Sequence, residues 1–170
     1  MVDRPRIVEE HGPSVWRTAY RLLSDQHEAN DCYQESFLAV LEYSRKSEVT
    51  NWSGLLKRIT TARALDRLRR RYRDRSEPLE NGAVVVGREE APDRPLQRAE
   101  WMDELRKAMA TLPEQQADVF WLREVEKLDN NEIAEHLKAT TSQVATWLHR
   151  AKQRLRRVLV ERGIAGEVKQ

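Results

Sequence analysis

Hydrophobic residues recur every three or four positions along most of the chain, which predicts amphipathic helices separated by short polar turns. The first predicted helix covers residues 13–23 and begins with Pro13, a residue that the first turn of a helix tolerates. The second extends to about Tyr43 and opens with Asp25 and Glu28, which have the spacing of a capping box. The third starts at Trp52, and its apolar face consists of Leu55, Leu56, Ile59, Ala62, Leu65 and Leu68.

A stretch rich in proline, glycine and acidic residues, residues 76–97, interrupts this periodicity and predicts a flexible acidic linker. Helical spacing resumes after it, at residues 98–111 and 114–127. We therefore predict an all-α protein with two small helical domains, residues 1–75 and residues 98–165.

Residues 131–159 predict two helices joined by a tight turn. Asp129 with Glu132, and Thr140 with Gln143, have the spacing of a capping box at the start of each helix. One stripe of the second helix is apolar, and its polar side is expected to face outward through Ser142, Gln143, Ala145, Thr146, His149 and Arg150. A capped short helix followed by a longer basic helix favours a DNA-binding helix-turn-helix domain over an ordinary helical hairpin.

The composition, 39% hydrophobic and 34% charged, is typical of a soluble helical protein. The single cysteine, Cys32, cannot form an internal disulfide, and we interpret it as a small buried hydrophobic residue. The amino terminus has no hydrophobic signal core, and no apolar run approaches the roughly 20 residues of a membrane span. We expect a cytoplasmic protein without membrane insertion.

The net charge is only +2, but residues 57–75 and 150–162 are strongly basic and the segment between them is acidic. Arg63, Arg67 and Arg70 form a row about one helical turn apart, which suits the phosphates of a nucleic acid; an RNA or a membrane surface would also accept it. The second helix carries an acidic stripe, which is either solvated or a partner surface, formed by Glu28, Asp31, Gln34, Glu35 and Glu42.

Catalytic constellations are missing from the sequence. The four histidines have no zinc-ligand spacing, no glycine-rich loop could hold a phosphate, and Cys32 has no nearby basic residue to activate it. We therefore expect neither an enzyme nor a cofactor or metal. An alternative from the enzyme class is a hydrolase that holds Mg²⁺ on Glu28, Asp31 and Glu35, although one helix face offers few converging oxygens.

Several motifs occur in a fixed order. DCYQESF at residues 31–37 resembles the pattern D-L-V-Q-E-x-F, and LDRLRR at residues 65–70 resembles the ending A-L-D-x-L-R-R. The second half adds LPE at 112–114, LREV at 122–125, EIAE at 132–135 and LHRA at 148–151. Together they resemble the bacterial extracytoplasmic-function (ECF) sigma factors of the sigma-70 family, over residues 15–73 and 100–160.

This resemblance implies an alternative sigma factor that binds RNA polymerase core and directs promoter recognition and transcription initiation. It implies contact with the clamp helices of the largest polymerase subunit through Glu28, Asp31, Gln34, Glu35 and Phe37. It implies binding of the promoter −10 element through Arg45, Lys46, Asn51, Trp52, Arg58, Arg63, Arg67 and Arg70. It implies binding of the −35 element through Thr141, Ser142, Gln143, Thr146, His149, Arg150, Lys152 and Arg156. An anti-sigma factor is a further partner that the resemblance leaves open.

Some positions depart from the family's pattern. In the first half, Thr61 and Ala62 stand where the family often has arginine and asparagine. In the second half, Lys138 replaces a common glycine, Ala145 a common lysine and Trp147 a common arginine. Trp147 either packs in the core against Trp121 or Phe120 or contacts DNA. The main alternative function is a stand-alone helix-turn-helix regulator whose amino-terminal domain binds a partner other than polymerase. The acidic stripe favours the sigma factor, because a repressor has no need of it.

Overall fold

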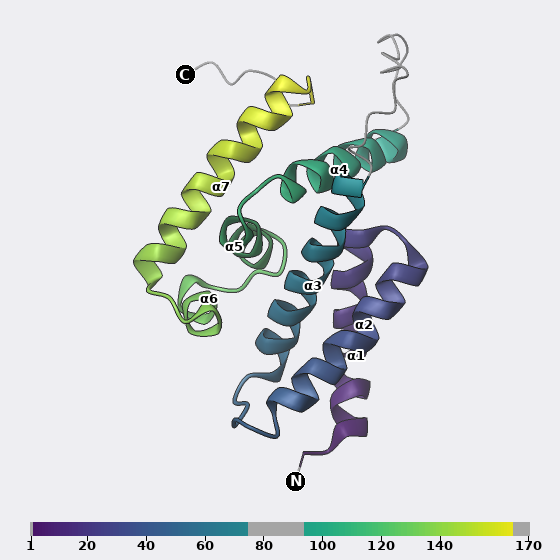
Figure 1. Ribbon diagram of the computed structural model, residues 1–170, viewed down its shortest axis with the longest axis vertical. Helices are drawn as coiled ribbons and strands as arrows, with labels where there is room; N and C mark the ends of the chain where they lie inside the picture. The colour runs from purple at the N-terminus through teal and green to yellow at the C-terminus, as the bar shows by residue number, and fades with distance from the viewer. Residues whose placement is uncertain (1, 75–93, 165–170) are drawn as a thin grey trace.

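The computed structural model describes residues 2–74 and 94–164, and all regular elements in these ranges are helices. The first half contains α1 (Arg4–Leu23), α2 (Gln26–Tyr43) and α3 (Trp52–Asp74). The second half contains α4 (Arg94–Ala110), α5 (Glu114–Glu124), α6 (Asn130–Leu137) and α7 (Thr141–Glu161). The predicted all-α fold is confirmed, and Figure 1 shows α3 between the other helices of the first half and those of the second.

The first helix begins at Arg4 rather than at Pro13, so its predicted start was wrong. The Asp3 carboxylate caps it by accepting a hydrogen bond from the backbone N–H of Arg6 at 3.3 Å. Pro5 occupies the first turn, where a missing N–H costs no hydrogen bond, and Pro13 lies inside the helix. Pro13 cannot donate a backbone hydrogen bond, but the helix continues through it, with buried residues both before it, at Ile7 and Gly12, and after it, from Val15 onward.

The second helix shows only half of its predicted capping box. The Asp25 carboxylate accepts a hydrogen bond from the backbone N–H of Glu28 at 2.8 Å, which lowers the pKa of Asp25. The Glu28 carboxylate does not return to the cap, because it forms an ion pair with Arg71 of α3. A contact between two helices has therefore replaced a contact within one turn.

Two boundaries in the second half also differ from prediction. The helix predicted from residue 98 begins at Arg94, so the predicted linker ends earlier, and the rest of it lies outside the described residues. The helix predicted to reach Lys127 ends at Glu124. Lys127 has a left-handed backbone with φ of 61°, which turns the chain toward α6.

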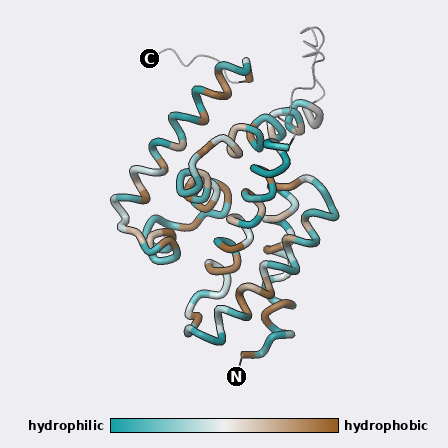
Figure 2. Tube along the Cα trace, in the orientation of Figure 1, coloured by the Kyte–Doolittle hydropathy of each residue, from teal (hydrophilic) through white to brown (hydrophobic). Residues whose placement is uncertain are grey.

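The hydrophobic core has three parts, and Figure 2 shows the hydrophobic positions distributed along every helix. One cluster lies within the first half and contains Ile7, Val15, Phe37, Val40, Leu55 and Leu56. Another lies within the second half and contains Val119, Leu122, Leu128, Ile133, Ala134 and Val144. The third joins the halves, with Leu65 and Leu68 of α3 and Trp121 of α5 among its buried members. The two predicted domains thus share a core.

Cys32 is fully buried in this shared core, and its thiol lies 3.8 Å from the backbone oxygen of Thr60. Burial raises the pKa of the thiol to about 11, so it stays protonated near neutral pH. This environment agrees with the interpretation of Cys32 as a small hydrophobic residue.

Lys138 ends α6 in the left-handed conformation, with φ of 52° and ψ of 45°, at a position that favours glycine. We predict that Lys138→Gly increases the free energy of unfolding by about 0.5–1 kcal/mol, because glycine adopts this conformation without a Cβ clash. Chemical denaturation followed by circular dichroism measures the change. Lys138→Ala is the control, since it removes the side chain but keeps Cβ; equal stabilisation by both variants would show that backbone conformation is not the cause.

Candidate nucleic-acid and partner interfaces

The turn between α6 and α7 is held by reciprocal hydrogen bonds at the start of each helix. The carboxylates of Asp129 and Glu132 each accept the other residue's backbone N–H at 2.9 Å. The Thr140 hydroxyl accepts the N–H of Gln143 at 3.1 Å, and the side-chain oxygen of Gln143 accepts the N–H of Thr140 at 2.9 Å. Both predicted capping boxes are confirmed, and they fix the direction in which α7 leaves the turn.

The outer side of α7 is polar and open to solvent. All of the predicted −35 residues are exposed, namely Thr141, Ser142, Gln143, Thr146, His149, Arg150, Lys152 and Arg156. The opposite side of the helix is buried against the second half through Val144, Ala151, Leu155 and Leu159. A helix that is anchored along one side and polar along the other can enter a major groove.

Some of the exposed residues on α7 also have structural contacts. The side-chain oxygen of Gln143 belongs to the cap, so its amide N–H groups remain for contacts outside the protein. Lys152 forms an ion pair with Glu124 at 2.7 Å, and this contact lowers the pKa of Glu124. If Gln143 or Lys152 binds a nucleic acid, it must do so while keeping its present contact within the protein, or it must break that contact.

Trp147 is half-buried and packs against the cluster of the second half that contains Ile133 and Val144. Trp121 and Phe120, its predicted partners, belong to the shared core instead. The packing therefore favours a structural role for Trp147, with different neighbours from those predicted.

The arginine row of α3 is engaged with the acidic stripe of α2. The Glu35 carboxylate binds Arg67 at 2.7 Å and Arg63 at 3.3 Å. Glu28 forms its ion pair with Arg71, one position beyond the predicted Arg70, which is exposed. The structure thus brings together residues that the sequence assigned to two different surfaces, and a phosphate that binds Arg63 or Arg67 must compete with Glu35.

The outward face of α2 is smaller than predicted and contains one unexpected residue. Asp31 and Gln34 are exposed, whereas Phe37 is only 5% exposed and packs in the core of the first half, so its side chain leaves little surface for a partner. Leu38 is 68% exposed and was missed. It lies seven positions after Asp31, on the same helix face, and that spacing was readable from the sequence.

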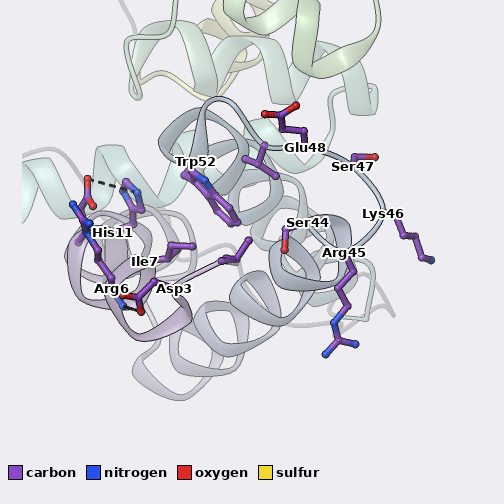
Figure 3. Close-up of a pocket in the computed structure, with 13 residues that line it drawn as sticks. Asp3, Arg6, Ile7, His11, Ser44, Arg45, Lys46, Ser47, Glu48 and Trp52 are labelled. Atoms are coloured by element: carbon purple, nitrogen blue, oxygen red, sulfur yellow. Dashed lines mark hydrogen bonds and ion pairs between the residues drawn. The ribbon is translucent and has the colours of Figure 1, made fainter.

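A groove of about 740 Å³ lies between the start of α1 and the loop from α2 to α3. Figure 3 shows Arg45 and Lys46 on the loop side and Arg6 and His11 on the α1 side, with Trp52 on the first turn of α3. The loop residues and Trp52 were predicted as binding residues. The α1 residues were missed because Pro13 was taken as the start of that helix.

Two other predicted −10 residues, Asn51 and Arg58, make contacts within the protein. The side-chain oxygen of Asn51 accepts the backbone N–H of Gly54 at 2.8 Å and so caps α3. Arg58 is half-buried on the side of α3 that faces Asp118 and His136 of the second half, and its Nε is buried without a hydrogen-bond partner. In this conformation only part of the Arg58 side chain is open to an external ligand.

Within residues 2–74 and 94–164, no three His, Cys, Asp or Glu side chains are grouped so that they could hold a metal ion. Glu28 and Glu35, two members of the hypothetical Mg²⁺ site, are bound by arginines instead. None of the described helices has the length and apolar character needed to cross a membrane.

Comparison with protein families gives two matches in chain order. The model of sigma-70 region 2 matches residues 7–74, which include most of α1 and all of α2 and α3. The model of sigma-70 region 4 matches residues 102–155, from within α4 to within α7. The region boundaries therefore follow the two halves of the fold.

Individual proteins agree with these matches. The ECF RNA polymerase sigma factor SigE of Mycolicibacterium smegmatis is 33% identical over 156 residues, which are 91% of this chain and 61% of SigE. SigW of Bacillus subtilis, also an ECF sigma factor, is 26% identical over 162 residues, covering 90% of this chain and 87% of SigW. The sigma factor RpoE of Bartonella quintana, solved with the anti-sigma factor NepR, has a similar fold, with a TM-score of 0.57, 18% identity and coverage of 94% and 98% of the two chains.

The pairing of Glu35 with two arginines leads to a prediction. Glu35→Gln should increase the affinity of the free protein for single-stranded DNA, because Arg63 and Arg67 lose their carboxylate partner. The slope of log affinity against log salt should steepen by about 0.7 for each additional phosphate that the variant neutralises. Fluorescence anisotropy across a salt series measures both quantities.

The matched control is Glu42→Gln, which removes the same charge from an exposed position two helical turns along the same face. The fold should persist in both variants, since exposed ion pairs contribute only about 0–1 kcal/mol. An equal increase in affinity for both variants would attribute the effect to net charge and contradict a specific role for the pairing.

Proposed function

Because this chain belongs to the sigma-70 family, we propose that it binds RNA polymerase core and directs it to promoters as an alternative sigma factor. The observation that carries the proposal is the exposed polar face of α7 behind a doubly capped turn, within the segment that matches region 4. The protein would supply binding and positioning, while polymerase supplies the chemistry. Its proposed place of action is the cytoplasm.

The proposed polymerase contact is the outward face of α2. Asp31 and Gln34 offer exposed acceptors there, and Leu38 offers an apolar side chain between them and Glu42. An acidic face of this kind suits a basic docking surface such as the one that the family uses on the clamp helices, because complementary charge orients the partners. Glu35 lies at the edge of this face and also anchors α3.

The proposed −10 contact is the groove beside the loop from α2 to α3. Trp52 is a half-buried aromatic side chain in its wall, on which an unpaired base can stack. Arg45 and Lys46 are exposed cations beside it, and they can neutralise the phosphates of the same strand. A single strand fits this combination better than a duplex, whose bases are already stacked.

The proposed −35 contact is α7. Gln143 can pair with adenine, and Arg150 with guanine or a phosphate, through the donors that each presents to the groove. The cations farther along the helix, including Arg156, would bind phosphates and hold the helix in place without reading sequence. RpoE of Bartonella quintana was solved with an anti-sigma factor, and we include such a protein among the proposed partners.

Transcription in vitro with purified polymerase core and a genomic promoter library tests the function. The wild-type protein should produce initiation at a defined subset of promoters. Asp31→Arg should abolish co-purification with core and transcription without unfolding the protein, because Asp31 is exposed and reversal of its charge opposes a basic docking site.

The control is Glu161→Arg, the same charge reversal at an exposed position near the end of α7. It should transcribe like the wild type. Normal activity of Asp31→Arg would show that α2 is not the docking face. No promoter-specific initiation by the wild-type protein would overturn the sigma-factor proposal and favour the stand-alone regulator.

A further inference from the structure

One continuous face of α1 lines the groove beside the loop from α2 to α3. Its members recur at helical spacing from the cap through the first two turns: Asp3, Arg6, Ile7, Glu10 and His11. Residues 3–11 span about 12 Å along the helix axis, since each residue adds about 1.5 Å. Stacked nucleotides are about 3.4 Å apart along one strand of a duplex, so this face is long enough to contact more than one nucleotide.

An apolar cluster beneath the groove fixes its two walls relative to each other. Ile7 of α1 is buried in the core cluster of the first half, and Val49 and Trp52 of the opposite wall pack against the same cluster (Figure 3). Asp3 caps α1 and Pro5 restricts the backbone of its first turn, so the start of the helix is held in place. The groove is therefore formed before any ligand enters it.

The cations on both walls are free to bind a ligand. Among the described residues, the side chains of Arg6, Arg45 and Lys46 form no ion pair and no hydrogen bond. Two members of the arginine row on α3, by contrast, are paired with Glu35. A phosphate that enters the groove therefore meets cations without having to displace a carboxylate from them.

The α1 wall also offers a hydrogen-bond acceptor. The Glu10 side chain is 61% exposed, and its Oε1 lies 4.0 Å from Nε2 of His11. Of the other carboxylates that line the groove, Asp3 is engaged in the helix cap and Glu48 belongs to the loop. A carboxylate repels a phosphate, but it accepts a hydrogen bond from the exocyclic amino group of cytosine or adenine, which thymine lacks. Glu10 is therefore suited to select a base rather than to add affinity.

We propose that α1 forms the second wall of the single-strand site, in which Arg6 binds a phosphate next to the base stacked on Trp52 and Glu10 selects cytosine or adenine over thymine. This inference rests on the proposed function for the identity of the strand. Arg6 supplies affinity that is independent of sequence, whereas Glu10 supplies sequence preference at a cost in affinity. The α1 wall thereby adds two binding residues to the groove proposed for the −10 element.

Photocrosslinking with the free full-length protein locates the strand. The probe is a short oligodeoxycytidine strand with one photoreactive thiothymine at its centre, and mass spectrometry identifies the crosslinked peptides. Crosslinks should form within residues 2–11 as well as within residues 44–52. Crosslinks within residues 44–52 and none within residues 2–11 would overturn the proposal, as would the absence of crosslinks from both segments.

Arg6→Ala should weaken binding of oligodeoxycytidine and oligodeoxythymidine strands by the same factor. It should also flatten the slope of log affinity against log salt by up to about 0.7, because one phosphate contact is lost. Arg17→Ala is the matched control, since Arg17 is an exposed arginine of the same helix that does not line the groove. Fluorescence anisotropy across a salt series measures both quantities, and equal effects of the two variants would overturn the phosphate contact of Arg6.

The wild-type protein should prefer oligodeoxycytidine to oligodeoxythymidine, and Glu10→Ala should reduce this preference about five-fold or more. The same variant should bind oligodeoxythymidine more tightly than the wild type, because a charge that repels phosphates is gone. Glu10→Gln keeps an acceptor oxygen without the charge, so it should retain part of the preference.

Glu9→Ala is the control for Glu10, because it removes the same charge from the adjacent exposed position, which lies outside the groove. An equal loss of preference in Glu9→Ala and Glu10→Ala, or no preference in the wild type, would overturn base selection by Glu10. All of these measurements use the protein without polymerase, so failure of the transcription assay would leave them unaffected. Conversely, a strand bound only by the loop and Trp52 would refute the role of α1 and leave the proposed −10 contact in place.

Discussion

Burial of Trp121 against the apolar face of α3 is the contact on which the arrangement of the molecule depends. Trp121 is 1% exposed and belongs to a cluster that draws residues from both halves. Two small helical domains would each bury only about 60% of their unfolded surface, so a shared core gives each half apolar surface that it could not bury alone. The same contact places α3 inside the molecule and leaves α7 on the outside (Figure 1).

Much of the fold could be predicted because its signals are local. Capping boxes at Asp129 and Thr140, and the polar side of α7, depend on residues only a few positions apart. The start of α1 was missed because Pro13 is itself a typical first-turn residue, whereas the helix already begins at Arg4 behind the Asp3 cap. The pairing of Glu35 with Arg63 and Arg67 depends on how α2 faces α3, and spacing within one helix carries no information about that.

Several candidate binding residues also hold the structure together. Glu35 ties α2 to α3, Asn51 caps α3, and Gln143 caps α7. Binding at these residues therefore exchanges one set of interactions for another, so the net free energy of binding is smaller than the new interactions alone would suggest. The residues that can bind without such an exchange lie on the exposed loop beside the groove, at Asp31 on α2, and along the outer side of α7 apart from Gln143 and Lys152.

We propose that this chain recognises a promoter but opens it only together with polymerase. Separation of strands costs about 1.4 kcal/mol for each base-pair step, and α3 of the free protein is partly covered. The most direct measurement is permanganate reactivity of thymines in the −10 element of a responsive promoter, with and without core enzyme. We predict reactive thymines only when core and this protein are both present. Strong reactivity with the protein alone would contradict the claim.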